Sequence, residues 1–144
     1  GMFGGRQTGY GFQMSTSDYV KVANEETLVV IMIESGEGVK NLPDILSVKG
    51  IDVVQIGSND LSQSLGYPGK LTAPTVLKAI DSVIAASRKA GVPVGVGSFA
   101  SFSQDRIKRF LDAGVQFVNI GTSNIITSGV ERWREWLDKA KTGK

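Results

Sequence analysis

The chain has 144 residues, of which 41% are hydrophobic and 21% charged, the size and composition of one ordinary globular domain. Sixteen basic residues against fourteen acidic ones give a formal charge of +2, too balanced to indicate a nucleic-acid or membrane partner. There is no run of about eighteen apolar residues, and the beginning of the chain lacks the apolar core of a signal peptide. We therefore expect a cytoplasmic protein.

Cysteine and histidine are both absent from the chain. Without cysteine there are no disulfides, thiolate metal sites or cysteine nucleophiles. Without histidine there is no Ser-His-Asp triad, no histidine-ligated zinc and no imidazole base. Any chemistry must therefore use carboxylates, lysines, hydroxyls, backbone amides or a bound ion.

In chain order, the glycine-rich residues 1–14 predict a loop, in which Gly1 before Met2 is typical of an expression-tag remnant. A helix is expected over residues 17–25. Four segments then repeat an apolar strand, a turn of glycine or small polar residues, and a helical pattern. The expected strands are residues 29–34, 52–56, 92–97 and 116–120, and the helices that follow them are residues 38–46, 73–90, 103–113 and 129–141.

This alternation predicts an α/β fold with parallel strands and right-handed crossovers. Doubly wound sheets and (β/α)₈ barrels share the pattern. The short, regular repeat and the Gly, Ser, Asn and Asp residues at the strand ends favour barrel units. A whole barrel needs about 250 residues. We therefore expect residues 1–144 to form one domain, a partial TIM barrel of about four β/α units.

Two carboxylates follow neighbouring expected strands. Taken alone, Glu34 is a charge at a strand end and Asp60 a helix cap ahead of residues 61–65. Together they would lie at the carboxyl ends of adjacent parallel strands, where a barrel places its active site. Converging carboxylates repel unless a cation lies between them. Two oxygen ligands, completed by water and substrate, suit Mg²⁺ or Mn²⁺. The turn over residues 57–60 can also expose several N–H groups to a carboxylate or phosphate.

The run IMIESGEGVKNLPDI, followed by IDVVQIGSNDLSQSLGYPG, resembles the HpcH/HpaI aldolase family, the metal-dependent pyruvate aldolases. More remotely it resembles the citrate lyase β-subunit group. The matching features are a strand ending in Glu34, the Asn-Leu-Pro helix start, the Gly-x-x-Asp-Leu-Ser run that contains Asp60, and a Gly-Tyr loop. The resemblance covers nearly the whole chain but only the C-terminal half of the family's barrel. It identifies the expected half-barrel as the second half.

The resemblance implies that Glu34 and Asp60 are metal ligands, with Mg²⁺ or Mn²⁺ as the ion. It also implies that pyruvate or a related 2-keto acid binds through Gly57, Ser58, Asn59 and Asp60. The family cleaves 4-hydroxy-2-keto acids to pyruvate and an aldehyde. Partners implied by the half-barrel are a second copy of the chain or the missing N-terminal half-barrel, because unpaired sheet edges are normally paired or covered.

Three departures separate this chain from the family pattern. The family's histidine and arginine, contributed by the first half of the barrel, have no counterpart, and Arg6 does not match that arginine. Met32 stands where glutamine is common, and Ser123 where relatives carry an acid. Two hypotheses follow: an aldolase or its metal- and pyruvate-binding half, and a non-catalytic truncated half-barrel that self-associates.

Three further motifs have simpler explanations. The loose Gly-x-Gly-x-x-Ala run at residues 95–100 lacks the acid that a dinucleotide-binding fold places after the next strand. Gly69-Lys70 lacks the spacing of a phosphate-binding loop. An apolar stripe on the last expected helix, containing Trp133 and Trp136, indicates core packing. The resemblance adds a neighbouring subunit as a second partner for that stripe.

Overall fold

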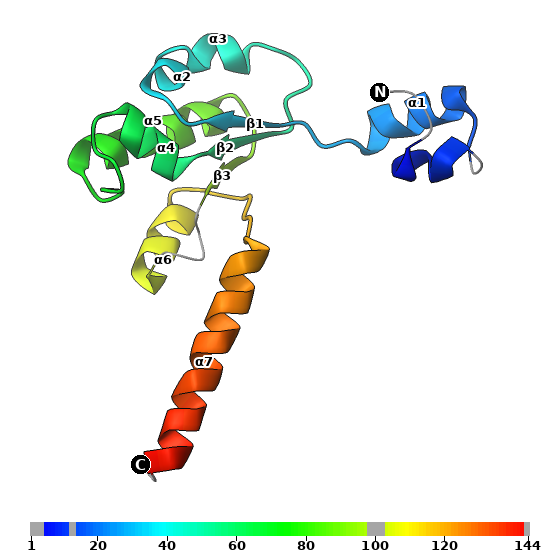
Figure 1. Ribbon diagram of the computed structural model, residues 1–144. Coiled ribbons are helices and arrows are strands. Elements are labelled where there is room, and N and C mark those ends of the chain that lie inside the picture. Colours follow the sequence, from blue (N-terminus) through cyan, green and yellow to red (C-terminus); the bar gives the residue numbers. More distant parts are fainter. Residues whose placement is uncertain (1–4, 12–13, 98–102, 143–144) are drawn as a thin grey trace.

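The computed structural model describes residues 5–11, 14–97 and 103–142 (Figure 1). Three parallel strands lie in the order β1-β2-β3, with helices between them in sequence. The strands are β1 (Val30–Ile33), β2 (Val53–Ile56) and β3 (Val94–Val96). The helices are η1 (Arg6–Gly11), α1 (Thr16–Glu26), α2 (Gly36–Lys40), α3 (Leu42–Leu46), α4 (Ser58–Ser64), α5 (Pro74–Lys89), α6 (Gln104–Asp112) and α7 (Thr122–Thr142). The predicted parallel α/β fold is confirmed.

The strand register separates the two faces of the sheet. Met32 lies opposite Gln55, and Gln55 opposite Gly95, so these residues share one face. The alternate residues form the other face, which is covered by helices. On the first face, Val30 is 39% and Met32 55% exposed. We call it the open face of the sheet, because no helix covers it among the described residues.

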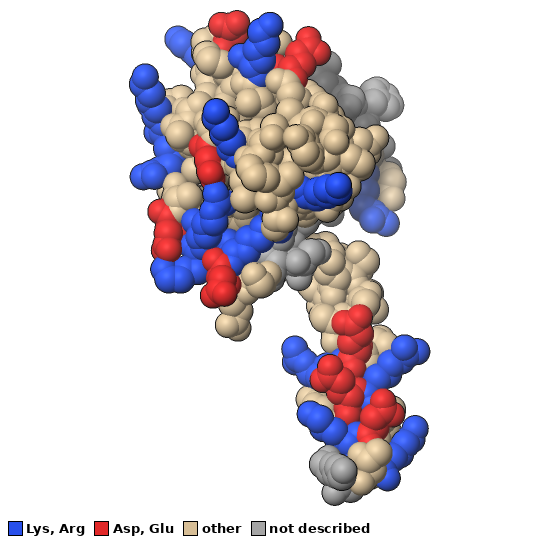
Figure 2. Space-filling view, turned by 90° about the vertical axis from the view of Figure 1, so that its left-hand side faces the viewer, with Lys and Arg blue, Asp and Glu red and all other residues tan. Residues whose placement is uncertain are grey.

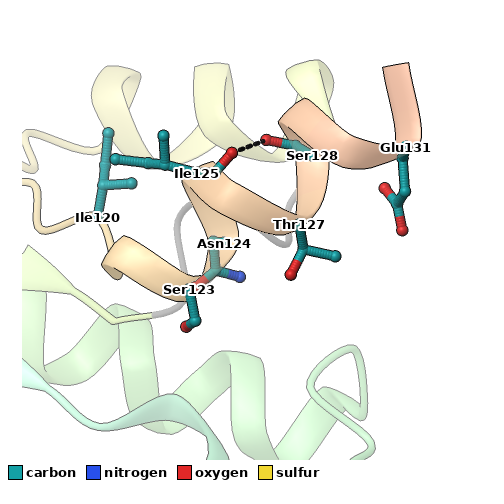
Figure 3. A pocket seen from close by; sticks show the side chains of 7 residues that line it. All are labelled: Ile120, Ser123, Asn124, Ile125, Thr127, Ser128 and Glu131. Atoms are coloured by element: carbon teal, nitrogen blue, oxygen red, sulfur yellow. Dashed lines mark hydrogen bonds between the residues drawn. The ribbon is translucent and has the colours of Figure 1, made fainter. Parts of the chain in front are cut away.

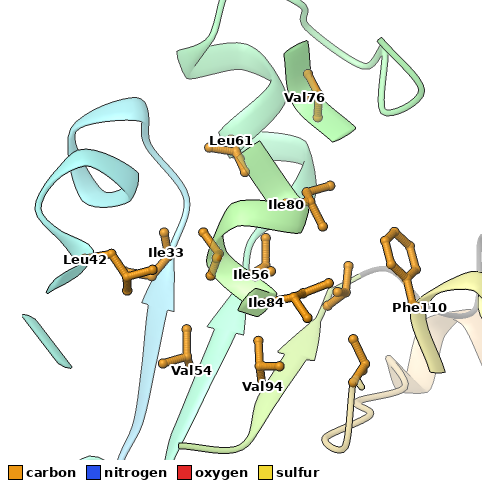
Figure 4. Close-up of a cluster of buried hydrophobic side chains, with 13 residues drawn as sticks. Ile33, Leu42, Val54, Ile56, Leu61, Val76, Ile80, Ile84, Val94 and Phe110 are labelled. Carbon is orange, nitrogen blue, oxygen red and sulfur yellow. The ribbon is translucent and has the colours of Figure 1, made fainter. Parts of the chain in front are cut away.

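The core fills the space between the helix-covered face of the sheet and α5 (Figure 4). The buried residues of α5 recur at the spacing of one helical face, as the sequence predicted. They pack against strand residues, Leu61 of α4 and Phe110 of α6. The cluster comprises Ile33, Leu42, Val54, Ile56, Leu61, Val76, Ile80, Val83, Ile84, Val94, Val96, Phe110 and Val115.

The expected fourth strand at residues 116–120 is not a strand in the structure. Only Phe117 forms an isolated parallel bridge, with Gly95, and its N–H donates to the Val94 carbonyl oxygen at 3.2 Å. Val118 and Ile120 are 45% and 59% exposed. An apolar run predicts burial on both faces. Phe117 is half-buried but the other residues of the segment are exposed, so the described residues bury too little of it to form a strand, and it pairs with β3 at one bridge.

The ends of the chain differ most from the sequence expectations. The expected loop over residues 1–14 contains a 3₁₀ helix, Arg6–Gly11, kinked where Gly9 and Tyr10 have positive φ angles. A glycine-rich segment without apolar periodicity gives no sign of such a turn. The expected helix at residues 17–25 is confirmed as α1, and Ser15 caps it by accepting from the Asp18 N–H at 3.2 Å.

Helix α7 begins at Thr122 rather than near residue 129, and none of its residues is buried. It projects away from the body, whereas α1 lies at the end of an extended connection on another side (Figure 1). Basic and acidic side chains both occur along α7 and over the visible face of the body (Figure 2). In the part of the chain that the structure describes, no helix is long and apolar enough to cross a membrane.

Candidate functional site

The candidate site begins where β1 and β2 end side by side. Glu34 follows the last residue of β1, and Gly57 follows the last residue of β2. The Gly57 N–H donates to the Ile33 carbonyl oxygen at 3.0 Å, which holds the two strand ends together. A Cβ atom at position 57 would lie 2.8 Å from Glu34 Cβ and 2.9 Å from Glu34 Oε2. The Glu34 side chain therefore lies across the glycine, in space that any other residue would occupy.

Helix α4 places the second carboxylate. Gly57 is the residue before the helix and supplies no side-chain cap, and Asp60 lies in the first turn. The expectation that Asp60 caps a helix over residues 61–65 is wrong, because the helix begins at Ser58. The uncapped N–H groups of a first turn carry partial positive charge. Asp60 is therefore an exposed acid in the first turn of α4, at the positive end of the helix.

The expected substrate-binding run, residues 57–60, is held by its first two positions. Ser58 is buried, and its hydroxyl donates to the Gly97 carbonyl oxygen at 3.4 Å. Asn59 and Asp60 face outward and are exposed. The carbonyl oxygen of Asn59 accepts from the Ser62 hydroxyl at 2.7 Å. The run therefore has a fixed inner end and an accessible outer end.

Two serines that the sequence reasoning missed anchor the turn after Glu34. Ser35 caps α2, its Oγ accepting from the Gly38 N–H at 3.0 Å. Ser64, in the last turn of α4, accepts from the Gly36 N–H at 3.1 Å. These bonds tie the loop that carries Glu34 to the helix that carries Asp60. The Ser35 cap could have been found from its position ahead of a helix start. The Ser64 contact spans 28 residues and leaves no local signal.

The two carboxylates suit a cation that needs few protein ligands. Neither Glu34 nor Asp60 makes a hydrogen bond or an ion pair within the described residues. The described residues also contain no group of three or more Asp, Glu, His or Cys side chains able to hold a metal ion. Two carboxylate oxygens with water and substrate oxygens can complete the sphere of Mg²⁺ or Mn²⁺, but not a closed protein cage.

A hollow of about 360 Å³ lies along the first turns of α7 (Figure 3). Its lining is rich in hydroxyl and amide groups, and Ser123, Thr127 and Glu131 point to one side of the helix. The Ser128 hydroxyl donates to the Ile125 carbonyl oxygen at 3.1 Å, so it is directed along the helix. The complete lining is Ile120, Ser123, Asn124, Ile125, Thr127, Ser128 and Glu131.

A second hollow, of about 330 Å³, lies between α5 and α6 and is lined in part by Arg106 and Arg109. Burial, and to a lesser extent the charge of Arg109, lowers the pKa of Arg106. Arg106 donates to the Leu71 carbonyl oxygen at 2.6 Å, and Arg109 pairs with Asp81 at 2.7 Å. Neither of these two hollows is lined by Glu34 or Asp60.

The other two motifs from the sequence remain outside the site. Gly95 and Gly97 belong to β3 and the turn after it, whereas Ser98, Phe99 and Ala100 lie outside the described residues. Gly69 has a φ angle of 71°, a left-handed conformation that glycine adopts easily in the tight turn after Tyr67. Its N–H donates to the Ser62 hydroxyl oxygen at 3.1 Å. This contact explains Gly69 as a loop glycine.

The fold is part of a (β/α) barrel, and comparison with known proteins agrees. The sequence profile of the HpcH/HpaI aldolase/citrate lyase family matches residues 5–127. The chain belongs to this family. It is 38% identical over 109 residues to a 4-hydroxy-2-oxo-heptane-1,7-dioate aldolase of Shigella sonnei, covering 76% of this chain and 40% of the aldolase. It is 37% identical over 115 residues to the Klebsiella pneumoniae protein of the same name, covering 79% and 42%.

Solved structures show the same partial match. An HpcH/HpaI aldolase/citrate lyase family protein from Burkholderia cenocepacia superposes with a TM-score of 0.77 at 27% identity, covering 94% of this chain and 50% of that one. The citrate synthase SbnG superposes with a TM-score of 0.72 at 26% identity, covering 94% and 55%. The chain therefore spans about half the length of these structures and two-fifths of the matched aldolases. Its fold is part of a TIM-barrel-like fold.

Proposed function

We propose that this chain is a divalent-metal-dependent aldolase, or the metal- and keto-acid-binding half of one. Glu34 and Asp60 would hold Mg²⁺ or Mn²⁺, and Gly57, Ser58, Asn59 and Asp60 would bind the carboxylate of pyruvate or a related 2-keto acid. The observation that carries the proposal is the Glu34 carboxylate lying across Gly57, beside the uncapped first turn of α4. The matched relatives named 4-hydroxy-2-oxo-heptane-1,7-dioate aldolases support the reaction class.

The proposed reaction breaks the C3–C4 bond of a 4-hydroxy-2-keto acid and gives pyruvate and an aldehyde. A bound divalent cation would supply Lewis-acid stabilisation of negative charge on the keto oxygen. The residues of this chain would do the rest: the two carboxylates fix the cation's position, and the first-turn N–H groups of α4 orient the substrate carboxylate. With no histidine in the chain, the proton that leaves the C4 hydroxyl would pass to a residue or water supplied with the rest of the barrel. Cleavage of the C3–C4 bond would leave the enolate of pyruvate, which would take a proton at C3 from the same group or from water to give pyruvate.

A second function, self-association without catalysis, is favoured by the surfaces that the described residues leave uncovered. On the open face of the sheet Met32 is exposed, and β1 lies at an edge beside which the described residues place no further strand. On α7, Trp133 is 60% exposed. We propose that a second copy of the chain, or a separate first-half barrel, covers these surfaces.

The proposed metal site is tested by calorimetric titration of Mn²⁺ into the protein with and without pyruvate. Pyruvate is expected to tighten Mn²⁺ binding, because both would contact the same ion. Glu34→Gln and Asp60→Asn should each weaken Mn²⁺ binding at least tenfold while the far-ultraviolet spectrum stays unchanged.

Glu37→Gln is the matched control, since Glu37 is an exposed acid in the first turn of α2 and is not one of the residues of the proposed site. Its Mn²⁺ affinity should equal that of the wild type. If the wild type bound no Mn²⁺ with or without pyruvate, the metal site would be refuted and the self-associating half-barrel favoured. If all three variants bound Mn²⁺ equally, the assignment of the ligands would be wrong.

A further inference from the structure

Gln55 is a polar residue in an unusual place, the middle of the central strand. It lies on the open face of the sheet, between Met32 and Gly95 in the register, yet only 2% of its surface is exposed. The neighbouring positions Val54 and Ile56 point the opposite way, into the core. Gln55 therefore belongs to the wall that faces the barrel interior, two positions below Gly57 and the strand end.

The Gln55 side chain fills space left by two glycines. A Cβ atom at Gly95 would collide with Gln55 Oε1, and a Cβ atom at Gly97 would lie 3.3 Å from Gln55 Nε2. Within the described residues, Oε1 has no hydrogen-bond partner although it is buried. An unpaired buried carbonyl is costly, so a role other than stability is expected for this amide.

The Nε2 group of Gln55 donates to Oδ1 of Asn119 at 3.2 Å. Asn119 is exposed and lies two residues beyond the Phe117 bridge, at the same rim as the strand ends. Because its oxygen faces Gln55, its Nδ2 group is the part left to meet a ligand. Within the described residues, the Asn119 Nδ2 group donates no hydrogen bond.

Among the described residues, the two rim positions between Glu34 and Asn119 carry no side chain. In strand order the rim positions are Glu34, Gly57, Gly97 and Asn119, so the two inner positions are both glycine. Neighbouring strands lie about 4.8 Å apart, so Glu34 and Asn119 are separated by about 14 Å along the rim, and less across a curved sheet. This gap fits a small molecule that binds a cation at one end and an amide donor at the other.

We propose that Asn119, oriented by Gln55, is a specificity-determining residue. It donates a hydrogen bond to an oxygen on the part of the substrate farthest from the cation. The inference rests on the proposed function and assigns to Asn119 the recognition of a distal acceptor oxygen, above all that of a second carboxylate such as the name of the matched relatives contains. Gln55 acts through Asn119 and is a positioning residue.

The test compares two keto acids of equal length, 2-oxoadipate with a distal carboxylate and 2-oxohexanoate without one. Their affinities and that of pyruvate are measured by calorimetry on the Mn²⁺-loaded protein. The wild type should bind 2-oxoadipate about tenfold more tightly than 2-oxohexanoate, the ratio expected for one hydrogen bond to a charged group. Asn119→Ala should abolish that ratio and leave pyruvate affinity unchanged.

Gln55→Glu keeps the shape of the side chain but removes the donor, so Asn119 would turn its amide nitrogen inward. The ratio should then fall to one or below. Gln55→Met, which buries no charge, should also reduce the ratio if the glutamate variant does not fold. Asn124→Ala is the matched control, because Asn124 lines the α7 hollow rather than the rim gap, and it should keep the wild-type ratio.

The outcomes separate this inference from the one on which it rests. Binding of Mn²⁺ and pyruvate with equal affinities for the two six-carbon acids would overturn the role of Asn119 and leave the proposed function standing. A preference for 2-oxoadipate that survives Asn119→Ala would also overturn it. Failure of Mn²⁺ and pyruvate to bind would overturn both.

Discussion

The Glu34 carboxylate and the backbone of Gly57 occupy adjoining space, with Glu34 Oε2 2.9 Å from the point where a Cβ at position 57 would lie. This contact is possible only because position 57 is glycine, and it sets the direction of the Glu34 side chain at the rim of the sheet. The same glycine precedes the uncapped first turn of α4. One residue thus gives Glu34 its position and gives α4 its free N–H groups.

Gly57→Ala adds only one methyl group, but it should disturb the position of the Glu34 carboxylate in the candidate site. The new methyl group would meet both Glu34 Cβ and Oε2, and it would also lie 3.2 Å from Met32 Sδ. We expect the Glu34 side chain to rotate away, Mn²⁺ affinity to fall at least tenfold, and stability to fall by about 1–3 kcal/mol, as for overpacking. Calorimetry and urea unfolding measure the two effects.

Gly129→Ala is the control for this substitution. Gly129 lies inside α7, and nothing lies within 4 Å of a Cβ atom built there. Alanine should stabilise the helix by about 1 kcal/mol, the usual difference in helix propensity, without changing Mn²⁺ affinity. Wild-type Mn²⁺ affinity in Gly57→Ala would show that the Glu34 carboxylate does not need its present position.

The parallel sheet and α5 could be predicted because their residues carry a local pattern. Short apolar runs end at glycine or small polar residues, and Val76, Ile80 and Val83 repeat on one helical face. The same rule failed at residues 116–120, where the apolar run reflects burial that the described residues do not supply. It also placed the start of α7 near Gly129, because an interior glycine resembles a boundary.

Part of the candidate site could be anticipated from the sequence, and its metal-binding role stays a prediction. Glu34 and Asp60 could be singled out because each lies just after an expected strand, where barrel sites lie. The hydrogen bonds around these residues could not be predicted. The Ser64 contact with Gly36 spans 28 residues, and the Gln55 contact with Asn119 spans 64. Such pairs form only when strand register brings distant segments together, and no spacing rule within one segment reports them. The steric need for glycine at position 57 likewise depends on the neighbouring strand.

Ile80→Ala should be strongly destabilising. Ile80 is fully buried in α5, within the cluster that joins the helix to the sheet. Removing its three outer carbons loses burial and leaves a cavity, at a cost of about 2–5 kcal/mol in the free energy of unfolding. Urea unfolding measures this loss. Ile125→Ala, at a residue 58% exposed on α7, should change the same free energy by less than about 0.5 kcal/mol. Equal effects at the two positions would mean that α7 is buried in solution.

The exposed apolar stripe of α7 predicts association between copies of the chain. Ile126, Val130, Trp133 and Leu137 follow one another at spacings of four, three and four residues, so they share a face of the helix. All four are more than two-fifths exposed, and a monomeric protein rarely leaves such a stripe open to water. Sedimentation equilibrium should give a molar mass that rises above 15.3 kDa at micromolar concentration.

Trp133→Glu places a charge in the middle of the stripe. It should raise the dissociation constant of the association at least tenfold, because burying an unpaired carboxylate in an apolar contact is unfavourable. Glu135→Lys, two positions away on the polar side of the same helix, changes charge by two units and leaves the stripe intact. It should associate like the wild type. The stripe does not hold the copies together if the wild type is a compact monomer at every concentration, or if both variants lose association equally. The open face of the sheet and the free edge of β1 would then be the surfaces to test next.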